Sequence, residues 1–229
     1  MAKLPVVALD GPAGAGKSTV ARRLADALGF VLLDTGAIYR TVALAASREG
    51  VAWSDDAGVA AVAAVVAEKG RLALVTTTDG TRVALDGEDV SDAIRTPEIS
   101  RGASLVSAIP AVRAALLSLQ RTFAEGGGVV MEGRDIGTVV APDAQAKFFV
   151  TASAEVRARR RWEELRARGA DVSLDATLAD VVSRDEADEG RSVAPLKAAA
   201  DAEIVDTSLL AIDEVVEHLV QRVRALSGR

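Results

Sequence analysis

The sequence predicts an α/β fold in which a central parallel sheet of five strands is covered by helices on both faces. Two observations support this prediction. Short apolar runs alternate along the chain with longer segments of helical periodicity, a pattern typical of strands connected by helical crossovers. The first apolar run leads directly into a glycine-rich turn and a helix, and sheets of this kind bind ligands where their strands end.

The expected strands are apolar runs with well-marked ends. Turn signals or helical segments flank each run, which keeps each strand short. The five runs cover residues 5–10, 30–33, 128–131, 147–150 and 202–205.

The expected helices follow from apolar residues at helical spacing. They cover residues 18–28, closed by Gly29, then 36–48, 55–69, 153–168, 174–189 and 212–226. The last of these gathers its apolar residues on one face, which leaves His218, the only histidine of the chain, at a solvated position.

Residues 71–90 break the alternation of strands and helices. Their β-branched runs are separated by the turn signals Asp79-Gly80 and Asp86-Gly87, which predicts an antiparallel insert. Together with the expected helix 55–69, this insert would form a small lobe beside the central sheet.

The composition limits the classes of function. With 229 residues, 49% of them hydrophobic, the chain can bury the core of one principal domain. The net charge of −6 disfavours nonspecific binding to nucleic acid, so any anionic ligand needs locally concentrated cations. The chain has no cysteine, which excludes disulfides and thiolate metal sites. No leader and no apolar stretch of membrane-spanning length is evident, so the default expectation is a cytoplasmic monomer without membrane or nucleic-acid partners.

A glycine-rich loop at residues 11–18, GPAGAGKS, matches the phosphate-binding pattern G-x-x-x-x-G-K-[ST]. It lies directly after an expected strand and before an expected helix, which is the context that this pattern requires. Its glycines let backbone amides turn toward an anion, Lys17 can reach the β and γ phosphates of ATP, and Ser18 can ligate Mg²⁺. The expected ATP-binding residues are Gly11, Pro12, Ala13, Gly14, Ala15, Gly16, Lys17, Ser18 and Thr19.

Two classes of phosphate-binding protein are excluded because the chain contains no asparagine. Guanine-specific switches read the base with an Asn-Lys-x-Asp motif, and protein kinases need an asparagine in the catalytic loop. The glycine-rich loop alone does not distinguish among the remaining classes.

Polar residues that follow the second and third expected strands are candidates for a second substrate site facing the loop. The candidates are Thr35, Gly36 and Arg40 after the second strand and Gly133, Arg134 and Asp135 after the third. Arg40 can clamp a phosphate, although a single arginine in such a segment is more often an exposed helix residue, and only its position after a sheet edge favours binding. For Arg134 and Asp135, the alternative to ligand binding is a mutual salt bridge that pins the loop.

An arginine-rich helical segment is a candidate for binding an anion. Arg157, Arg160 and Arg161 share one face of the expected helix 153–168, and three converging guanidinium groups call for an anion between them. The alternative is a solvated basic face that nearby glutamates neutralise.

A second helical stripe carries Arg184, Asp188 and Arg191. An ordinary ion pair between Arg184 and Asp188 is the simpler interpretation of this spacing. The flanking segment SRDEADEGRSVAPL interrupts any apolar face, however, which suits a mobile lid better than a core helix.

Taken together, these segments resemble the bacterial cytidylate kinases, a family of P-loop nucleoside-monophosphate kinases, along nearly the whole chain. The resemblance rests on DGPAGAGKST, LLDTGAIYR, LDGEDVSDAIRTPEIS, PAVRAALLSLQR, EGRDIGTVV, RARRRWEEL and GRSVAPLKAAADA, in this order. It implies the three-layer fold of P-loop NTPases, with the antiparallel insert in a monophosphate-binding lobe and a helical lid. The single domain would comprise a core at about 1–50, 105–155 and 195–229, the lobe at about 51–104 and the lid at about 156–194.

The resemblance also implies roles for individual residues. Lys17 and its loop would hold the ATP phosphates, and Arg157, Arg160 and Arg161 would be the cations of the lid. Thr35, Arg40, Arg134 and Arg191 would bind the monophosphate, and Ser104, Arg113 and Asp135 would read cytosine. Arg184 and Asp188 would contact the pentose and the neighbouring phosphate. Many members of the family carry Ser where this chain has Thr35, which keeps the hydroxyl group.

The implied reaction is transfer of the γ-phosphoryl group of ATP, with Mg²⁺, to CMP or dCMP. The exocyclic amine of cytosine donates where uracil has an acceptor, so Asp135 and Ser104 can accept from it while Arg113 serves the acceptor edge of the ring. Two alternatives stay open at this point. One is a P-loop kinase for another small acceptor such as UMP, and the other is a noncatalytic nucleotide sensor that signals through lid closure.

Overall fold

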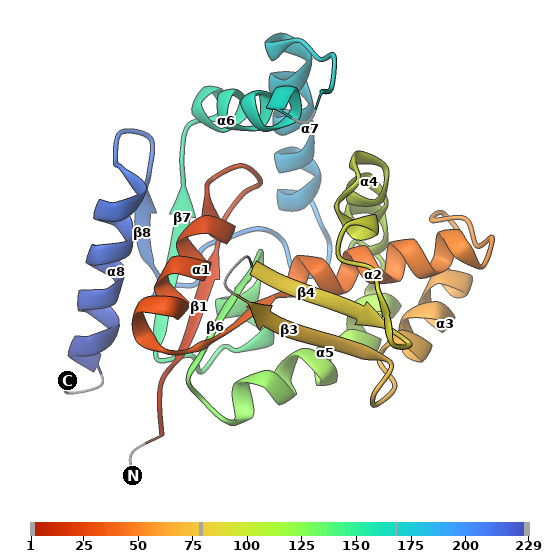
Figure 1. Ribbon diagram of the computed structural model, residues 1–229, viewed down its shortest axis with the longest axis horizontal. Coiled ribbons are helices and arrows are strands. Elements are labelled where there is room, and N and C mark those ends of the chain that lie inside the picture. Colours follow the sequence, from red (N-terminus) through yellow and green to blue (C-terminus); the bar gives the residue numbers. More distant parts are fainter. Residues whose placement is uncertain (1–2, 78–79, 168, 227–229) are drawn as a thin grey trace.

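Five parallel strands form the central sheet in the order β2-β6-β1-β7-β8, in a computed structural model that describes residues 3–77, 80–167 and 169–226 (Figure 1). The strands are β1 (Val6–Asp10), β2 (Val31–Asp34), β6 (Val129–Gly133), β7 (Ala146–Thr151) and β8 (Glu203–Asp206). The five predicted strands and the predicted parallel sheet are confirmed. From β1 the chain continues to β2 at one edge of the sheet, whereas from β6 it continues to β7 on the other side. Parallel sheets bind ligands at the carboxyl ends of adjacent strands whose connections run in opposite directions, so a site is expected at the ends of β1 and β6.

The α-helices cover both faces of the sheet. They are α1 (Lys17–Leu28), α2 (Thr35–Arg48), α3 (Asp56–Val66), α4 (Pro97–Val106), α5 (Pro110–Glu125), α6 (Ala154–Ala167), α7 (Leu174–Glu189) and α8 (Ile212–Leu226). A 3₁₀-turn, η1 (Ala93–Arg95), precedes α4, and a π-helical turn, η2 (Ile136–Val140), follows β6. The six predicted helices are confirmed, within a few residues at their ends.

Helices α4 and α5 are additions to the sequence prediction. Both begin with proline in the first turn, where its missing N–H costs nothing, and the Thr96 side chain caps α4 by accepting from the backbone N–H of Ile99. These start signals at Thr96-Pro97 and at Pro110 were available in the sequence.

Strand β1 separates two apolar layers because its alternate side chains point to opposite faces. Val7 and Leu9 pack in a cluster with α1 and α8, whereas Val6 and Ala8 belong to a larger cluster that includes residues of α2, α3, α4 and α5. The strand is buried over its whole length, as expected of a parallel sheet covered on both faces.

The predicted antiparallel insert is confirmed as a three-stranded sheet of β3 (Leu72–Thr77), β4 (Gly80–Leu85) and β5 (Glu88–Asp89). Asp86 and Gly87 both have positive φ, as a tight hairpin turn requires. The other predicted turn signal falls partly outside the described residues, since Asp79 is not among them. Val83, Leu85 and Val90 pack into the same apolar cluster as Leu33 of the central sheet.

Helices α6 and α7 pack against each other and lie beyond the carboxyl ends of the central strands (Figure 1). These two helices are the segments for which the sequence predicts a lid.

Within the described ranges, no single helix is long and apolar enough to cross a membrane. Helices α4 and α5, which are bent by 99° relative to each other, reach the required length and hydropathy only when they are taken together.

Candidate active site

A cleft of about 1420 Å³ opens where β1, β2 and β6 end. Its walls are the glycine-rich loop, the start of α2, one face of α4, the residues after β6, and the lid helices α6 and α7. Pockets for one small ligand commonly measure about 300–1,000 Å³, so this cleft has room for two substrates side by side. More cationic than acidic side chains line it, although the whole chain carries a charge of −6.

The glycine-rich loop curls tightly between β1 and α1. Gly11, Gly14 and Gly16 all have positive φ, and a Cβ on Gly11 would lie 1.9 Å from the carbonyl oxygen of Val150. Only glycine fits there without displacing the neighbouring strand β7. The loop ends at Gly16, which is the residue before the first turn of α1, so the positive end of the helix faces the cleft.

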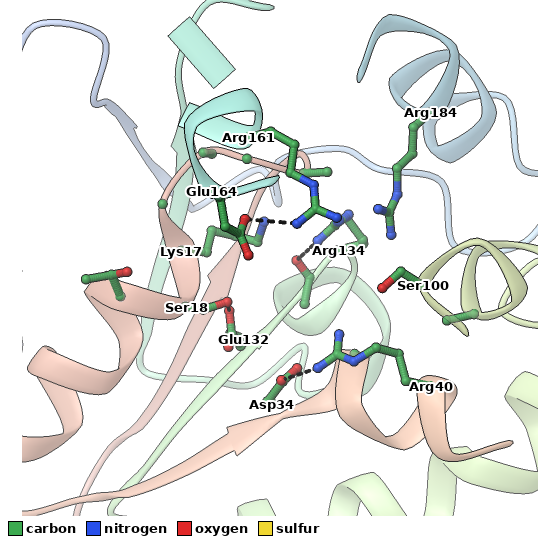
Figure 2. Close-up of a pocket in the computed structure, with 18 of the residues that line it drawn as sticks. Lys17, Ser18, Asp34, Arg40, Ser100, Glu132, Arg134, Arg161, Glu164 and Arg184 are labelled. Carbon is green, nitrogen blue, oxygen red and sulfur yellow. Dashed lines mark hydrogen bonds and ion pairs between the residues drawn. The ribbon is translucent and has the colours of Figure 1, made fainter. Parts of the chain in front are cut away.

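A buried cation and a buried carboxylate lie at the base of the cleft. The Lys17 ammonium donates to the carbonyl oxygen of Pro12 at 2.6 Å, and the Ser18 hydroxyl donates to Glu132 at 2.9 Å. Burial and the nearby carboxylate of Asp34 raise the pKa of Glu132 to about 7. Burial and the guanidinium of Arg134 lower the pKa of Lys17 well below its ordinary value. Figure 2 shows Lys17, Ser18 and Glu132 together beneath the lid arginines.

Glu132 was missed by the sequence prediction, which ends the third strand at residue 131. The strand extends through Glu132 and Gly133, so the Glu132 carboxylate lies at the end of the strand that borders the cleft. The useful signal is an acidic residue directly after an apolar run and directly before Gly133-Arg134.

Oxygen donors suitable for Mg²⁺ are present at this position. The Ser18 hydroxyl and the Glu132 carboxylate are hard oxygen ligands within hydrogen-bond distance of each other. Among the described residues no group of three or more acidic or histidine side chains could hold a metal ion by itself. The donor set therefore fits an ion such as Mg²⁺, which uses one or two protein ligands and completes its shell with phosphate oxygens and water.

Two carboxylates hold the arginines predicted for the second substrate. Asp34 pairs with Arg40 at 2.7 Å, and Asp188 pairs with Arg134 at 2.9 Å and also with Arg191. Burial raises the pKa of Asp188, but the guanidinium groups of Arg134 and Arg191 lower it by more, and the net shift is downward.

Neither of the two simpler ion pairs considered from the sequence is formed among the described residues. Arg134 turns to Asp188 instead of its neighbour Asp135, and Asp188 is paired with Arg134 and Arg191 instead of Arg184.

Arg184 has the most exceptional environment of these arginines. Its side chain points into the cleft, and within the described ranges its buried Nε atom has no hydrogen-bond partner (Figure 2). Burial, with the nearby cation of Arg134, lowers the pKa of Arg184 to about 10. A largely buried guanidinium beside another cation is costly unless an anion joins them, so this is a natural position for a phosphate group.

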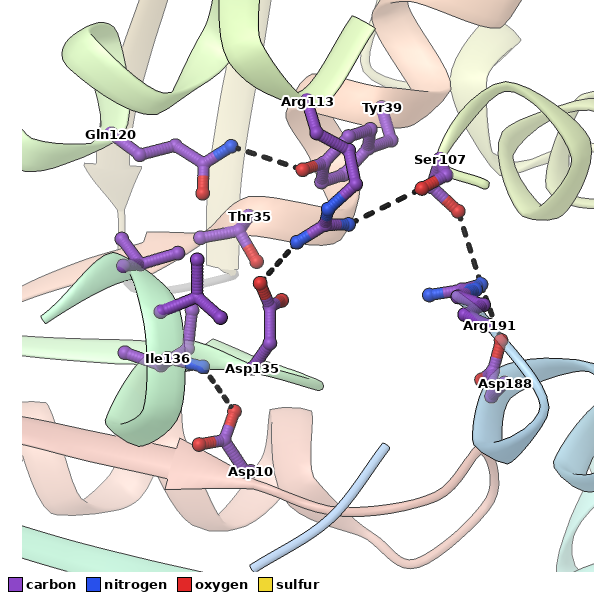
Figure 3. A network of polar contacts seen from close by, with 12 residues as sticks. Asp10, Thr35, Tyr39, Ser107, Arg113, Gln120, Asp135, Ile136, Asp188 and Arg191 are labelled. Carbon is purple, nitrogen blue, oxygen red and sulfur yellow. Dashed lines mark hydrogen bonds and ion pairs between the residues drawn. The ribbon is translucent and has the colours of Figure 1, made fainter. Parts of the chain in front are cut away.

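Arg113 and Asp135, two of the three residues predicted to read a base, meet at the end of β6. Arg113 of α5 pairs with Asp135 and donates to the carbonyl oxygen of Ser107 at 3.2 Å (Figure 3). Its guanidinium carbon lies 5.6 Å from the centre of the Tyr39 ring. Burial raises the pKa of Asp135, while the charge of Arg113 opposes this shift. The third residue, Ser104 of α4, also lines the cleft, and its backbone carbonyl accepts from the Ser107 hydroxyl at 3.1 Å.

Tyr39 and Ser107 were not predicted and both line this region. Ser107 accepts from Arg191 at 3.1 Å through its hydroxyl, and Tyr39 accepts from the buried Gln120 at 3.4 Å. The sequence offered only a weak signal for them, namely their position in segments on which the family resemblance rests.

Thr35, Gly36 and Gly133 line the cleft where β6 meets the start of α2. The Thr35 hydroxyl donates to the backbone carbonyl of Glu132 at 2.7 Å. A Cβ on Gly133 would lie 2.8 Å from that hydroxyl, and a Cβ on Gly36 would lie 3.0 Å from an Arg40 nitrogen. Glycine at position 133 lets β6 approach the start of α2 closely, and glycine at position 36 leaves room for the ion pair of Arg40 and Asp34.

The three lid arginines do not converge as predicted. Arg160 and Arg161 line the cleft, where Arg160 donates to Thr207 and Arg161 pairs with Glu164 at 2.9 Å. Arg157 is buried away from the cleft. It donates to the carbonyl oxygen of Ala13 in the glycine-rich loop at 3.2 Å and pairs with Asp185 of α7 at 2.6 Å. Helical spacing places the three arginines on one face of α6. Because α6 packs against the loop and against α7, however, each arginine contacts different partners.

A glycine-rich loop with a buried lysine, facing a set of arginines across a cleft beneath a helical lid, defines a P-loop phosphotransferase. Comparison with known proteins gives the family. The sequence model described as Cytidylate kinase matches residues 7–225, and the chain belongs to the cytidylate kinase family.

The chain is similar over almost its whole length to curated members of this family. It is 54% identical over 226 residues to the cytidylate kinase of Pelotomaculum thermopropionicum, which covers 98% of both chains. It is 53% identical over 219 residues to the cytidylate kinase of Geobacter sulfurreducens, covering 96% of this chain and 92% of that protein. Among solved structures, an uncharacterized protein from Eubacterium ventriosum shares the fold, with a TM-score of 0.54 at 12% identity over 97% of this chain and 99% of that one.

Proposed function

We infer that the protein transfers the γ-phosphoryl group of ATP to CMP or dCMP, giving ADP and CDP or dCDP. The observation that carries this inference is that one cleft contains both the phosphate-binding loop with Lys17 and the buried pair of Arg113 and Asp135. The first is suited to a nucleoside triphosphate, and the second offers an acceptor and donors matched to the edge of cytosine.

The acceptor nucleotide binds on the side of the cleft formed by α2, α4 and the residues after β6. Asp135 accepts from the exocyclic amine of cytosine, with Ser104 beside it, and Arg113 donates to the acceptor edge of the ring. Uracil would present a carbonyl oxygen to the Asp135 carboxylate and be repelled. Arg40, Arg134 and Arg191 hold the monophosphate, and Asp188 orients the last two.

The donor nucleotide binds on the side of the glycine-rich loop. Backbone amides of the loop and the Lys17 ammonium surround its phosphates. Ser18 and Glu132 are the residues that would hold Mg²⁺, which would supply positive charge to the phosphates of the donor.

Transfer requires positioning and charge neutralisation instead of a covalent intermediate. The acceptor phosphate is largely ionised near neutral pH, so an oxygen of that phosphate attacks the γ-phosphorus in line, and no general base is needed. Arg184 lines the cleft with a buried Nε that has no hydrogen-bond partner in the described ranges, and Arg160 and Arg161 approach from α6. Closure of α6 and α7 over the cleft would exclude water, which would otherwise consume ATP by hydrolysis.

A panel of acceptors tests the proposed function. Purified protein with ATP and Mg²⁺ is expected to phosphorylate CMP and dCMP faster than UMP or AMP, measured by coupled ADP release and by chromatography of the products. A clear preference for UMP or AMP over both cytidylates would contradict the proposal, and so would nucleotide binding without any CDP formation.

The variant Lys17→Ala is the matched test of the donor side. Loss of one preorganised cation at the transferring group is expected to lower kcat by at least about 10²-fold, with an unchanged far-UV circular dichroism spectrum. Unchanged turnover would show that the loop does not hold the reacting phosphates.

A further inference from the structure

Asp10, the last residue of β1, is buried beside the cleft but does not line it. Its side chain is aimed at the start of η2. One carboxylate oxygen accepts from the backbone N–H of Ile136 at 2.7 Å, and the other accepts from the N–H of Gly137 at 2.7 Å. Figure 3 shows Asp10 beneath the loop, on the far side of that loop from Arg113. These two amides belong to the first residues after Asp135.

The first of these hydrogen bonds fixes the peptide plane between Asp135 and Ile136 from one side. The same plane is fixed from the other side, because the carbonyl oxygen of Asp135 accepts from the N–H groups of Val139 at 2.9 Å and Val140 at 3.2 Å. A peptide plane held at both its N–H and its C=O cannot rotate without breaking several hydrogen bonds. The orientation of this plane sets the ψ angle of Asp135, and thereby the direction in which its carboxylate meets Arg113.

We propose that Asp10 is a positioning residue for base recognition, which holds the Asp135–Ile136 peptide so that Asp135 and Arg113 present one fixed edge to the pyrimidine of the acceptor. This inference rests on the proposed function. It assigns to Asp10 no contact with either substrate. A carboxylate is required because it accepts from two N–H donors at once, whereas an asparagine amide has a single oxygen acceptor and would direct its NH₂ group at the second donor.

Among the described residues, the Asp10 carboxylate forms no direct ion pair, although its charge acts on the nearby Lys17 ammonium. Asp10 is 3% exposed, so water cannot replace the two hydrogen bonds. The charged groups closest to it are Lys17 of α1, whose ammonium donates to Pro12, and Asp135 itself. On β7, the stem of Lys147 packs near Gly137, and its ammonium pairs with Asp201. Burial raises the pKa of Asp10 to about 6, against the lowering by the two backbone hydrogen bonds, which is the cost of keeping a carboxylate there without a direct ion pair.

The isosteric variant Asp10→Asn tests the proposal. Loss of one buried hydrogen bond and an unsatisfied donor are expected to raise the KM and the dissociation constant for CMP by about tenfold or more. The preference for CMP over UMP in kcat/KM is expected to fall by a similar factor, while the KM for ATP stays within about twofold of wild type. Asp10→Glu, which keeps both acceptors, is expected to recover part of the preference.

Asp55→Ala is the control, because Asp55 also accepts a backbone N–H, from Gly58 at the start of α3, but far from the cleft. It is expected to lower stability without changing selectivity. A folded Asp10→Asn variant with wild-type KM and preference for CMP would overturn the inference alone, and so would an equal rise in the KM for ATP. A wild-type enzyme without preference for CMP would overturn the proposed function and this inference with it.

Discussion

At the scale of single residues, the cleft contains buried charged groups, and the burial of a charge by itself opposes folding. Lys17, Glu132, Asp135 and Arg184 all have pKa values shifted by burial toward the neutral form. Perturbed titration of this kind concentrates at functional sites, because ligands supply the missing charge partners. Two predictions follow from particular members of this set.

Asp135→Ala is expected to reduce the preference for CMP over UMP by at least about tenfold in kcat/KM. The carboxylate is the acceptor for the exocyclic amine in the proposed complex, and its loss also frees Arg113 from its ion pair. The KM for ATP is expected to change little. The exposed carboxylate of Asp143 offers the control Asp143→Ala, which should leave both constants unchanged. A defect confined to ATP would contradict the placement of Asp135 on the acceptor side.

Glu132→Gln is expected to stabilise the protein at pH 8 by on the order of 1–3 kcal/mol, with a difference that disappears toward pH 5. The pKa of Glu132 is raised from 4.5 to about 7, so the folded state retains this proton at pH values where the unfolded chain has lost it. The stability that comes from the protonated form is complete below about pH 4.5 and is lost as the pH rises through about 7. Glutamine cannot ionise, and it can still accept from Ser18.

Urea denaturation of wild type and Glu132→Gln at pH 5 and pH 8 measures this effect, with Glu125→Gln as a control at an exposed position. A stability difference that does not depend on pH would show that burial does not raise the pKa of Glu132.

At the scale of elements, a buried ion pair joins α6 to α7, and a hydrogen bond joins α6 to the glycine-rich loop. Arg157 of α6 and Asp185 of α7 are 7% and 16% exposed in their side chains, and Arg157 also reaches the carbonyl oxygen of Ala13. The second oxygen of Asp185 is buried, and it has no hydrogen-bond partner in the part of the chain that the structure describes. Asp185 lies next to Arg184, so this pair sets how α7 presents Arg184 to the cleft.

Asp185→Ala is expected to lower kcat by about ten- to a hundredfold, because the reacting groups lose their alignment when α7 is released. Amide hydrogen exchange in α7 should become faster, while the exchange of the central strands stays unchanged. Glu186→Ala, one residue further on the exposed side of the same helix, is the control. Wild-type exchange and turnover in Asp185→Ala would show that the ion pair does not hold α7 in place.

At the scale of the whole molecule, the insert and the central sheet share one core. Ile94 of η1 and Val83 of β4 are buried in the same apolar cluster as Leu33 and Met131 of the sheet. A continuous core implies that the proposed monophosphate-binding lobe and the sheet unfold together.

Ile94→Ala is expected to lower the free energy of unfolding of the entire protein by about 2–5 kcal/mol, in a single calorimetric transition. Val75→Ala on β3, at a position that is 56% exposed, should change it by less than about 0.5 kcal/mol. A separate early transition of the insert in Ile94→Ala would show that the lobe is an independent folding unit.

The sheet, the glycine-rich loop and six helices could be predicted because each is encoded by neighbouring residues. The continuous apolar run of β1 and the helical spacing in α8 are local patterns, and the loop motif needs only its own glycines and Lys17. The end of β6 was placed too early because Glu132 reads as the end of an apolar run. Helices α4 and α5 were missed although Pro97 and Pro110 mark their starts.

The sequence by itself determined the fold class, the phosphate-binding loop and the family, since motif order and short-range periodicity carry that information. Only the tertiary structure decided which charged groups meet. Asp10 reaches the amide of Ile136, Arg134 pairs with Asp188, and Arg157 is drawn away from Arg161 toward the loop and α7. A buried charge pairs with a group that the packing of sheet and helices brings within hydrogen-bond distance. Spacing along the chain does not determine which groups these are.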